Sequence, residues 1–230
     1  TNLLATTFNK IDEYHSAAFE RFKDNRLTVA RRLASERGLN PADVDAEGFP
    51  KGFSKKNQAV MIPAFFAAYS GGSASGVSLD AFKNIPVPEW NMRYTGLMRV
   101  PIIKSSFRRF SLAHGYRASY SLSEVRTNLD YDFADLTKKN VAGDYLNDKL
   151  FTTVTLVEQF NPLLRADMEL KNSMSLLAEF NRDRTISISL DNDYLTEILR
   201  KEYKFGLGYR FKDLSFVTRI NGSQTTLKSD

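Results

Sequence analysis

The sequence predicts a mainly β fold: a segment of a large antiparallel transmembrane β-barrel with an N-terminal helical region. Three observations support this class. Apolar residues recur every three or four positions near the N-terminus, they alternate with polar residues from Trp90 onward, and clusters of Asn, Asp, Gly and Pro interrupt the alternation. We therefore expect a helical region with an extended linker over residues 1–88 (a cap, loop or lumen insertion) and barrel strands over residues 89–230.

Two helices are expected in the first region. The longer one covers residues 3–37 and ends at Gly38, after which Asn40-Pro41 opens a turn. The second covers residues 57–69 and is almost entirely apolar, so we expect it to be buried or docked. Residues 85–88 contain two prolines and predict an extended linker.

Strands follow with a period of two, most clearly over residues 110–123. Turn residues at positions 161–162, 171–173, 181–183, 191–193, 212–213 and 221–222 divide the remainder. This predicts about eight strands at a pitch of roughly 10 residues, which is typical of outer-membrane barrels. Residues 130–148 are polar and predict a long loop. A soluble antiparallel sheet alternates in the same way, so a soluble barrel or sandwich remains open.

In the membrane interpretation, the two faces of the strands have different partners. Aromatic residues near strand ends would form the interfacial girdle, and the charged faces would line water. The lumen-facing candidates are Arg117, Arg165, Glu169, Glu179, Lys204 and Arg210. The lipid-facing candidates are Leu112, Tyr116, Tyr120, Met168, Leu176, Ile186, Ile188, Phe205, Leu207 and Tyr209.

Composition narrows the function classes. The 230 residues include no cysteine, which removes disulfides and thiol chemistry, and no apolar run approaches the roughly 18 residues of a membrane helix. The net charge of +5 is spread along the chain, so no nucleic-acid partner is expected; the locally basic residues 99–109 are interpreted as a solvated turn. The chain starts at Thr1 without a leader, and we expect a segment of a longer protein.

No catalytic, cofactor or metal site is expected. His15 and His114 lack partners at catalytic spacing, and Gly206-x-Gly208 lies inside a predicted strand instead of opening a helix. The Asp-rich turns do not continue into a calcium-loop pattern. The sequence therefore predicts a protein that is not an enzyme.

Several strings in the same order resemble the late part of the SprA/Sov family. They are IPAFFAAYSG at 62–71, VSLD at 77–80, IPVPEW at 85–90, LAHGYR at 112–117, QFNPLL at 159–164 and GLGYRFKD at 206–213. The resemblance covers most of the chain from about residue 57 onward, whereas the first helix matches less distinctly.

The resemblance implies the translocon of the type IX secretion system in the outer membrane of Bacteroidetes, which also supports gliding motility in some species. Its implied partners are membrane lipid, the remainder of the barrel, a PorV-like shuttle barrel, a plug protein and secreted cargo. Two other functions remain open from the residues alone: another outer-membrane barrel transporter, and a soluble β-rich binding module.

Overall fold

The computed structural model describes residues 4–8, 16–82, 88–211, 214–220 and 223–229. The chain forms two compact units, which are described separately. Unit 1 comprises residues 1–88, 118–158 and 184–199, and unit 2 comprises residues 89–117, 159–183 and 200–230. The first segment of unit 1 ends at residue 88, and the strands that follow contribute residues to both units.

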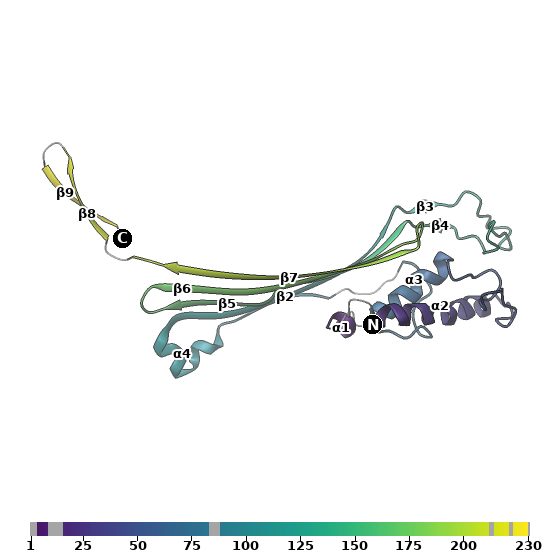
Figure 1. The fold of residues 1–230 in the computed structure, drawn as a ribbon, viewed down its shortest axis with the longest axis horizontal. Coiled ribbons are helices and arrows are strands. Elements are labelled where there is room, and N and C mark those ends of the chain that lie inside the picture. The colour runs from purple at the N-terminus through teal and green to yellow at the C-terminus, as the bar shows by residue number, and fades with distance from the viewer. Residues whose placement is uncertain (1–3, 9–15, 83–87, 212–213, 221–222, 230) are drawn as a thin grey trace. The chain divides into compact units, whose positions relative to one another are not determined.

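The fold is mainly β, as predicted, with a five-stranded antiparallel sheet in the order β1-β2-β5-β6-β7 (Figure 1). Two pairs of short strands, β3-β4 and β8-β9, complete the described strands. The helices are α1 (Leu4–Thr7), α2 (Ala17–Glu36), α3 (Gln58–Tyr69), the 3-10 helix η1 (Gly96–Arg99) and α4 (Pro101–Ser106). The strands are β1 (Glu89–Tyr94), β2 (Phe107–Ser123), β3 (Arg126–Thr127), β4 (Lys149–Leu150), β5 (Thr153–Leu170), β6 (Met174–Ser189), β7 (Tyr194–Tyr209), β8 (Leu214–Ile220) and β9 (Ser223–Ser229).

The expected first helix is wrong as a single element. α1 ends at Thr7, and α2 begins at Ala17 because the hydroxyl of Ser16 caps it by accepting a hydrogen bond from the Phe19 N–H. Residues 9–15 of the predicted helix lie outside the described residues. The second helix is confirmed, with Asn57 as its N-cap and ten of its twelve residues buried.

Two expected turns are also wrong, because β5 runs through Asn161-Pro162 and β6 runs through residues 181–183. Beside the proline, the His114 ring donates a hydrogen bond from Nδ1 to the Leu163 carbonyl at 2.7 Å. A Cβ at Gly115 would lie 3.0 Å from the Asn161 carbonyl oxygen, so a residue without a side chain permits the close approach of β2 and β5 there. The strands are consequently 16–18 residues long, well beyond the predicted pitch.

In unit 1, α3 covers one side of the strands. The ring of Phe66 packs edge-on against Tyr120 at 5.7 Å, and Val154, Leu156 and Ile188 are almost fully buried. The apolar sequence of α3 is therefore explained by burial on several sides.

The predicted loop at residues 130–148 is held against the helical region of unit 1. The Asp144 carboxylate accepts hydrogen bonds from the backbone N–H and the hydroxyl of Ser54, both at 2.6 Å. Next to it, the Tyr145 N–H donates to the Gly52 carbonyl. Gly52 has φ +93°, and a Cβ at this position would clash with the Tyr145 ring, so the docked loop requires glycine here.

Candidate functional surface

Unit 2 has strands with two chemically different faces. Successive side chains of a strand point to opposite sides, and contacts between neighbouring strands identify which residues share a side. On one side the ring of Phe180 stacks on Tyr203 at 4.7 Å with an interplanar angle of 6°. On the other side Glu179, the residue before Phe180, binds cations on both neighbouring strands. One face is therefore aromatic and the other is charged.

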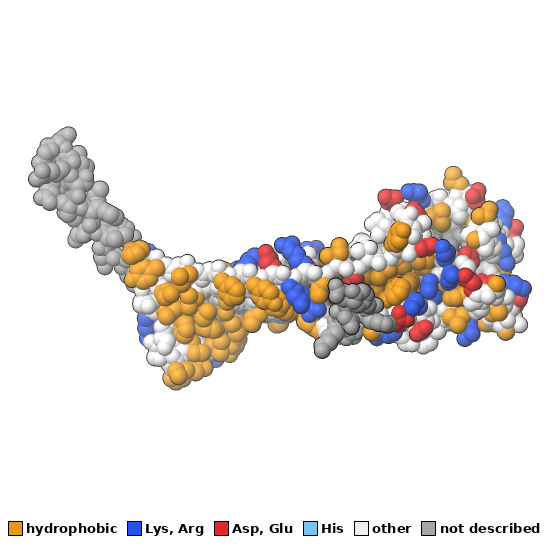
Figure 2. All heavy atoms as spheres, viewed as in Figure 1, with side chains coloured by type: hydrophobic (Ala, Val, Ile, Leu, Met, Phe, Trp, Pro, Cys, Tyr) orange, Lys and Arg blue, Asp and Glu red, His pale blue; other side chains and the backbone are white. Residues whose placement is uncertain are grey.

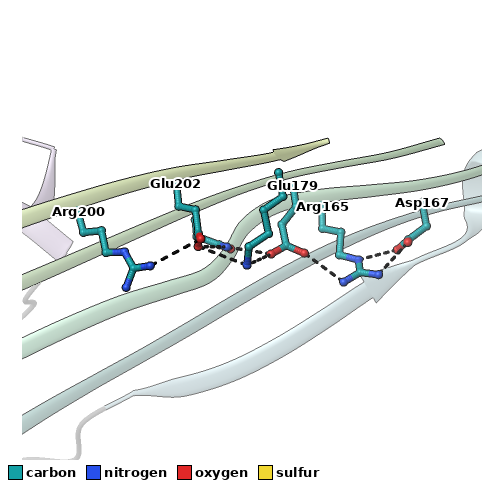
Figure 3. A network of polar contacts seen from close by, with 7 residues as sticks. Arg165, Asp167, Glu179, Arg200 and Glu202 are labelled. Carbon is teal, nitrogen blue, oxygen red and sulfur yellow. Dashed lines mark hydrogen bonds and ion pairs between the residues drawn. The ribbon is translucent and has the colours of Figure 1, made fainter. Parts of the chain in front are cut away.

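The charged face is organised around Glu179 (Figure 3). The guanidinium of Arg165 donates two hydrogen bonds to Asp167, both at 2.9 Å, and a third to Glu179 at 3.1 Å. Only 9% of the Glu179 side chain is exposed, against 40% of Arg165. The carboxylate thus lies beneath a cation that itself reaches solvent.

The same network continues onto β7. The Asn181 amide donates to Glu179 at 2.8 Å and to Glu202 at 3.2 Å, while the Lys204 ammonium lies 3.2 Å from Glu179 and 3.3 Å from Glu202. Arg200 approaches Glu202 at 3.6 Å. Acidic and basic side chains alternate in a row, so the surface is hydrophilic and close to neutral.

Ion pairs of the same kind join β2 to its neighbours in unit 2. Glu169 lies 3.5 Å from Arg108 and 3.8 Å from Arg109, and Arg117 lies 3.8 Å from Glu89 on β1. These pairs bridge neighbouring strands, so Glu169 and Arg117 each have an oppositely charged partner.

The opposite face of unit 2 is apolar and largely open. Phe205 is 82% exposed and Leu207 is 72% exposed, and Tyr203 and Tyr209 are also more exposed than buried. A cluster of hydrophobic side chains is visible in Figure 2 over the end of unit 2 that includes α4. Exposed apolar surfaces larger than scattered single residues are characteristic of interaction sites in proteins.

Most of the predicted lumen-facing residues share the charged face, and most of the predicted lipid-facing residues share the apolar face. Five lumen-facing candidates, Arg117, Arg165, Glu169, Glu179 and Lys204, lie on the charged face; Arg210 follows the end of β7 and is exposed. Six lipid-facing candidates lie on the apolar face of unit 2: Leu112, Met168, Leu176, Phe205, Leu207 and Tyr209.

The lipid-facing prediction is wrong for four residues, because other parts of the protein cover their side chains. Tyr116 is 2% exposed and packs between the rings of Trp90 at 4.5 Å and Phe160 at 4.8 Å. Ile186 and Ile188 are buried in unit 1. Tyr120 contacts α3 and donates its hydroxyl hydrogen to the Ala81 carbonyl at 3.0 Å.

Sequence reasoning missed a buried charge cluster in unit 1. The Arg184 guanidinium lies 3.4 Å from Glu158 and 2.7 Å from Glu197, and the Arg184 side chain is only 3% exposed. Hydroxyls of α1 complete the cluster: Thr6 accepts a hydrogen bond from Arg184 at 3.0 Å, and Thr7 donates one to Glu158 at 2.7 Å. A signal was present, since Glu158 and Arg184 interrupt otherwise apolar positions of their strands.

The described residues carry no group of three or more side chains suited to hold a metal ion. Among the helices of the described part of the chain, none has the length and apolar character needed to cross a membrane. Comparison with models of known protein families gave no match, and comparison with curated proteins gave no significant match.

Proposed function

We propose that this chain forms part of the wall of an outer-membrane protein-export pore, the type IX secretion translocon of Bacteroidetes. The observation that carries the proposal is the two-faced sheet of unit 2, in which the same strands present an open apolar face and a paired, charged face. A barrel wall needs this combination, because lipid lies on one side and water on the other. The choice of the type IX translocon among outer-membrane pores rests on the sequence strings that resemble the SprA/Sov family.

The length of the strands in unit 2 fits a bilayer. Of β2, β5, β6 and β7, residues 107–117, 159–170, 174–183 and 200–209 belong to this unit, which makes 11, 12, 10 and 10 residues. A transmembrane strand needs about 9–11 residues when tilted. The backbone groups at the outer edges of β1 and β7 must be paired inside lipid, so the proposal requires further strands from the remainder of the barrel.

The charged face suits an aqueous passage. Paired acidic and basic groups hold water without giving the surface a strong net charge, so passing protein finds little to adhere to electrostatically. The shuttle barrel, the plug and the cargo rest on the resemblance alone. Within this proposal the chain has a structural role and is not an enzyme.

Accessibility of alternate positions in β7 tests the proposal. The chain has no cysteine, so single substitutions such as Lys204→Cys, Phe205→Cys and Leu207→Cys give clean labels in the protein in its native outer membrane. A bulky, water-soluble thiol reagent is expected to label Lys204→Cys and to leave the two apolar positions unreacted. Ile188→Cys, buried in unit 1, serves as the control for protection by protein alone.

Two outcomes contradict the proposal. Full labelling of Phe205→Cys and Leu207→Cys in native membranes would place this face in water and favour a soluble β-rich module. Protection of all three positions would mean that the charged face does not line an aqueous space. If the alternating pattern is found, a pore diameter too small for folded protein would instead favour a solute transporter.

A further inference from the structure

The locally basic segment at residues 99–109 belongs to the connection between β1 and β2 in unit 2. From Trp90 to Ser123 the sequence contains six basic residues and no acidic residue, so the remaining chain is close to neutral: 26 basic against 27 acidic residues. Arg108 and Arg109 are paired with Glu169. Among the described residues, Arg99 and Lys104 have no acidic partner and are exposed.

Two further basic residues lie at the same end of unit 2. The Lys171 N–H donates to the Ser106 carbonyl at 3.3 Å, and the Arg210 N–H donates to the Ser173 carbonyl at 3.0 Å. Backbone hydrogen bonds therefore place the turn after β5 next to the end of α4, and the end of β7 next to that turn. Arg99, Lys104, Lys171 and Arg210, called the basic rim below, are all exposed, and the described residues offer none of them an ion-pair partner.

Apolar and aromatic side chains accompany the basic rim. Ile102 of α4 is 75% exposed and Val100 is 40% exposed, although both are large apolar residues. Phe211 is also exposed and forms an edge-to-face contact with Tyr209 at 4.8 Å. Figure 2 shows hydrophobic side chains gathered at the α4 end of unit 2. Exposed aliphatic, aromatic and cationic groups occur together where a protein meets the headgroup layer of a membrane.

We infer that the basic rim binds the phosphate groups of anionic phospholipids at one surface of the bilayer, with Ile102 and Val100 inserted among the upper acyl chains. This inference rests on the proposed barrel wall and adds its lipid partner and the position of one membrane boundary. The ammonium and guanidinium groups supply the charge complementarity, and the apolar side chains continue the open face of the strands into the interface.

Lipid selection by the reconstituted protein tests the inference. The full protein is placed in nanodiscs of equal parts phosphatidylcholine and phosphatidylglycerol, and the phosphatidylglycerol retained after mild delipidation is measured. The variant Arg99→Gln/Lys104→Gln is expected to lose this enrichment, by about fivefold for each charge. The charge-preserving variant Arg99→Lys/Lys104→Arg should keep the phosphatidylglycerol enrichment. Neutralising the exposed Arg31 and Lys51 of unit 1 should have no effect.

A second measurement reports the position of α4. A fluorophore on Ile102→Cys is expected to be quenched by lipids that carry a quencher in the headgroup, and to be shielded from a quencher dissolved in water. Unchanged phosphatidylglycerol enrichment in the Gln variant, or quenching only from water, would overturn the inference. Phe205→Cys in the same nanodiscs separates the two proposals: if it stays protected, only the lipid rim fails, whereas its reaction would contradict the barrel wall itself.

Discussion

The two units contain charge clusters of opposite character. In unit 1, Arg184 is sealed beneath α1 with two carboxylates, and no more than 11% of any of the three side chains is exposed. In unit 2, Arg165 and Lys204 reach solvent at 40% and 49% exposure while neutralising Glu179 below them. A sealed ion pair depends completely on its partners, whereas an open one is screened by water. We therefore expect the first cluster to contribute strongly to stability and the second to tolerate substitution.

The apolar faces of the two units also differ in how far they are exposed. In unit 1 Ile186 and Ile188 are buried, whereas in unit 2 Phe205 and Leu207 are exposed. The same alternation of apolar and polar residues thus gives a buried core in one unit and an exposed apolar face in the other. Substitutions at matched positions test whether the surroundings of the two faces also differ.

The largest effect is expected from Arg184→Met. The substitution leaves Glu158 and Glu197 buried without their cation, and breaking a buried ion pair in this way costs about 3–5 kcal/mol. Hydrogen exchange of amides in α1 and α3 should accelerate accordingly, because local opening becomes easier. The triple variant Arg184→Met/Glu158→Leu/Glu197→Leu should recover most of the loss, since it removes the stranded charges. Unchanged exchange in Arg184→Met would show that water reaches this cluster.

A smaller but clear effect is expected from Phe205→Arg in unit 2. A cation on the lipid face of a barrel costs about 2–4 kcal/mol near the bilayer midplane. The variant should assemble less completely in the outer membrane, as measured by the fraction resistant to extraction and to protease. Lys204→Gln is the matched control, because Lys204 directly precedes Phe205 and lies on the opposite, charged face of β7. Equal loss in both variants would contradict an asymmetric environment of β7.

Much of the fold could be predicted because it depends on local patterns. The period of two in β7 and the apolar run of α3 are visible in the sequence and correspond to observed elements. The opposite facing of Glu179 and Phe180 also follows from alternation alone. These features need no knowledge of which strands are neighbours.

The errors arose where a distant partner overrides local preference. Asn181 has the chemistry of a turn residue, yet its amide binds Glu179 and Glu202, and β6 continues through it. Asn161-Pro162 reads as a break, but His114 and Gly115 of β2 accommodate it within β5. The burial of Tyr120 depends on Phe66 of α3, a packing partner that strand periodicity cannot reveal.

The burial of Tyr69 in unit 1 also predicts that the stability of this unit falls at alkaline pH. Burial raises the pKa of Tyr69 in α3 to about 12, above its ordinary value near 10. The unfolded chain therefore loses this proton first as the pH rises, and unit 1 should lose about 2–3 kcal/mol of stability between pH 10 and pH 12. Tyrosinate absorbance compared between the native protein and Tyr69→Phe isolates this residue. A Tyr69 that titrates with the exposed tyrosines would mean that α3 leaves its ring accessible to water.

The smallest effect is expected from Arg165→Ala. Glu179 keeps the Lys204 ammonium and the Asn181 amide, and the lost guanidinium was 40% exposed, so the free energy of unfolding should change by only about 0–1 kcal/mol. Denaturant unfolding of the reconstituted protein, compared with Arg184→Met, measures the contrast directly. Adding Lys204→Ala to Arg165→Ala removes both cations from Glu179 and should cost more than the sum of the single changes, because they share one carboxylate. A large loss from Arg165→Ala alone would instead place this face in a dry interior and argue against an aqueous passage.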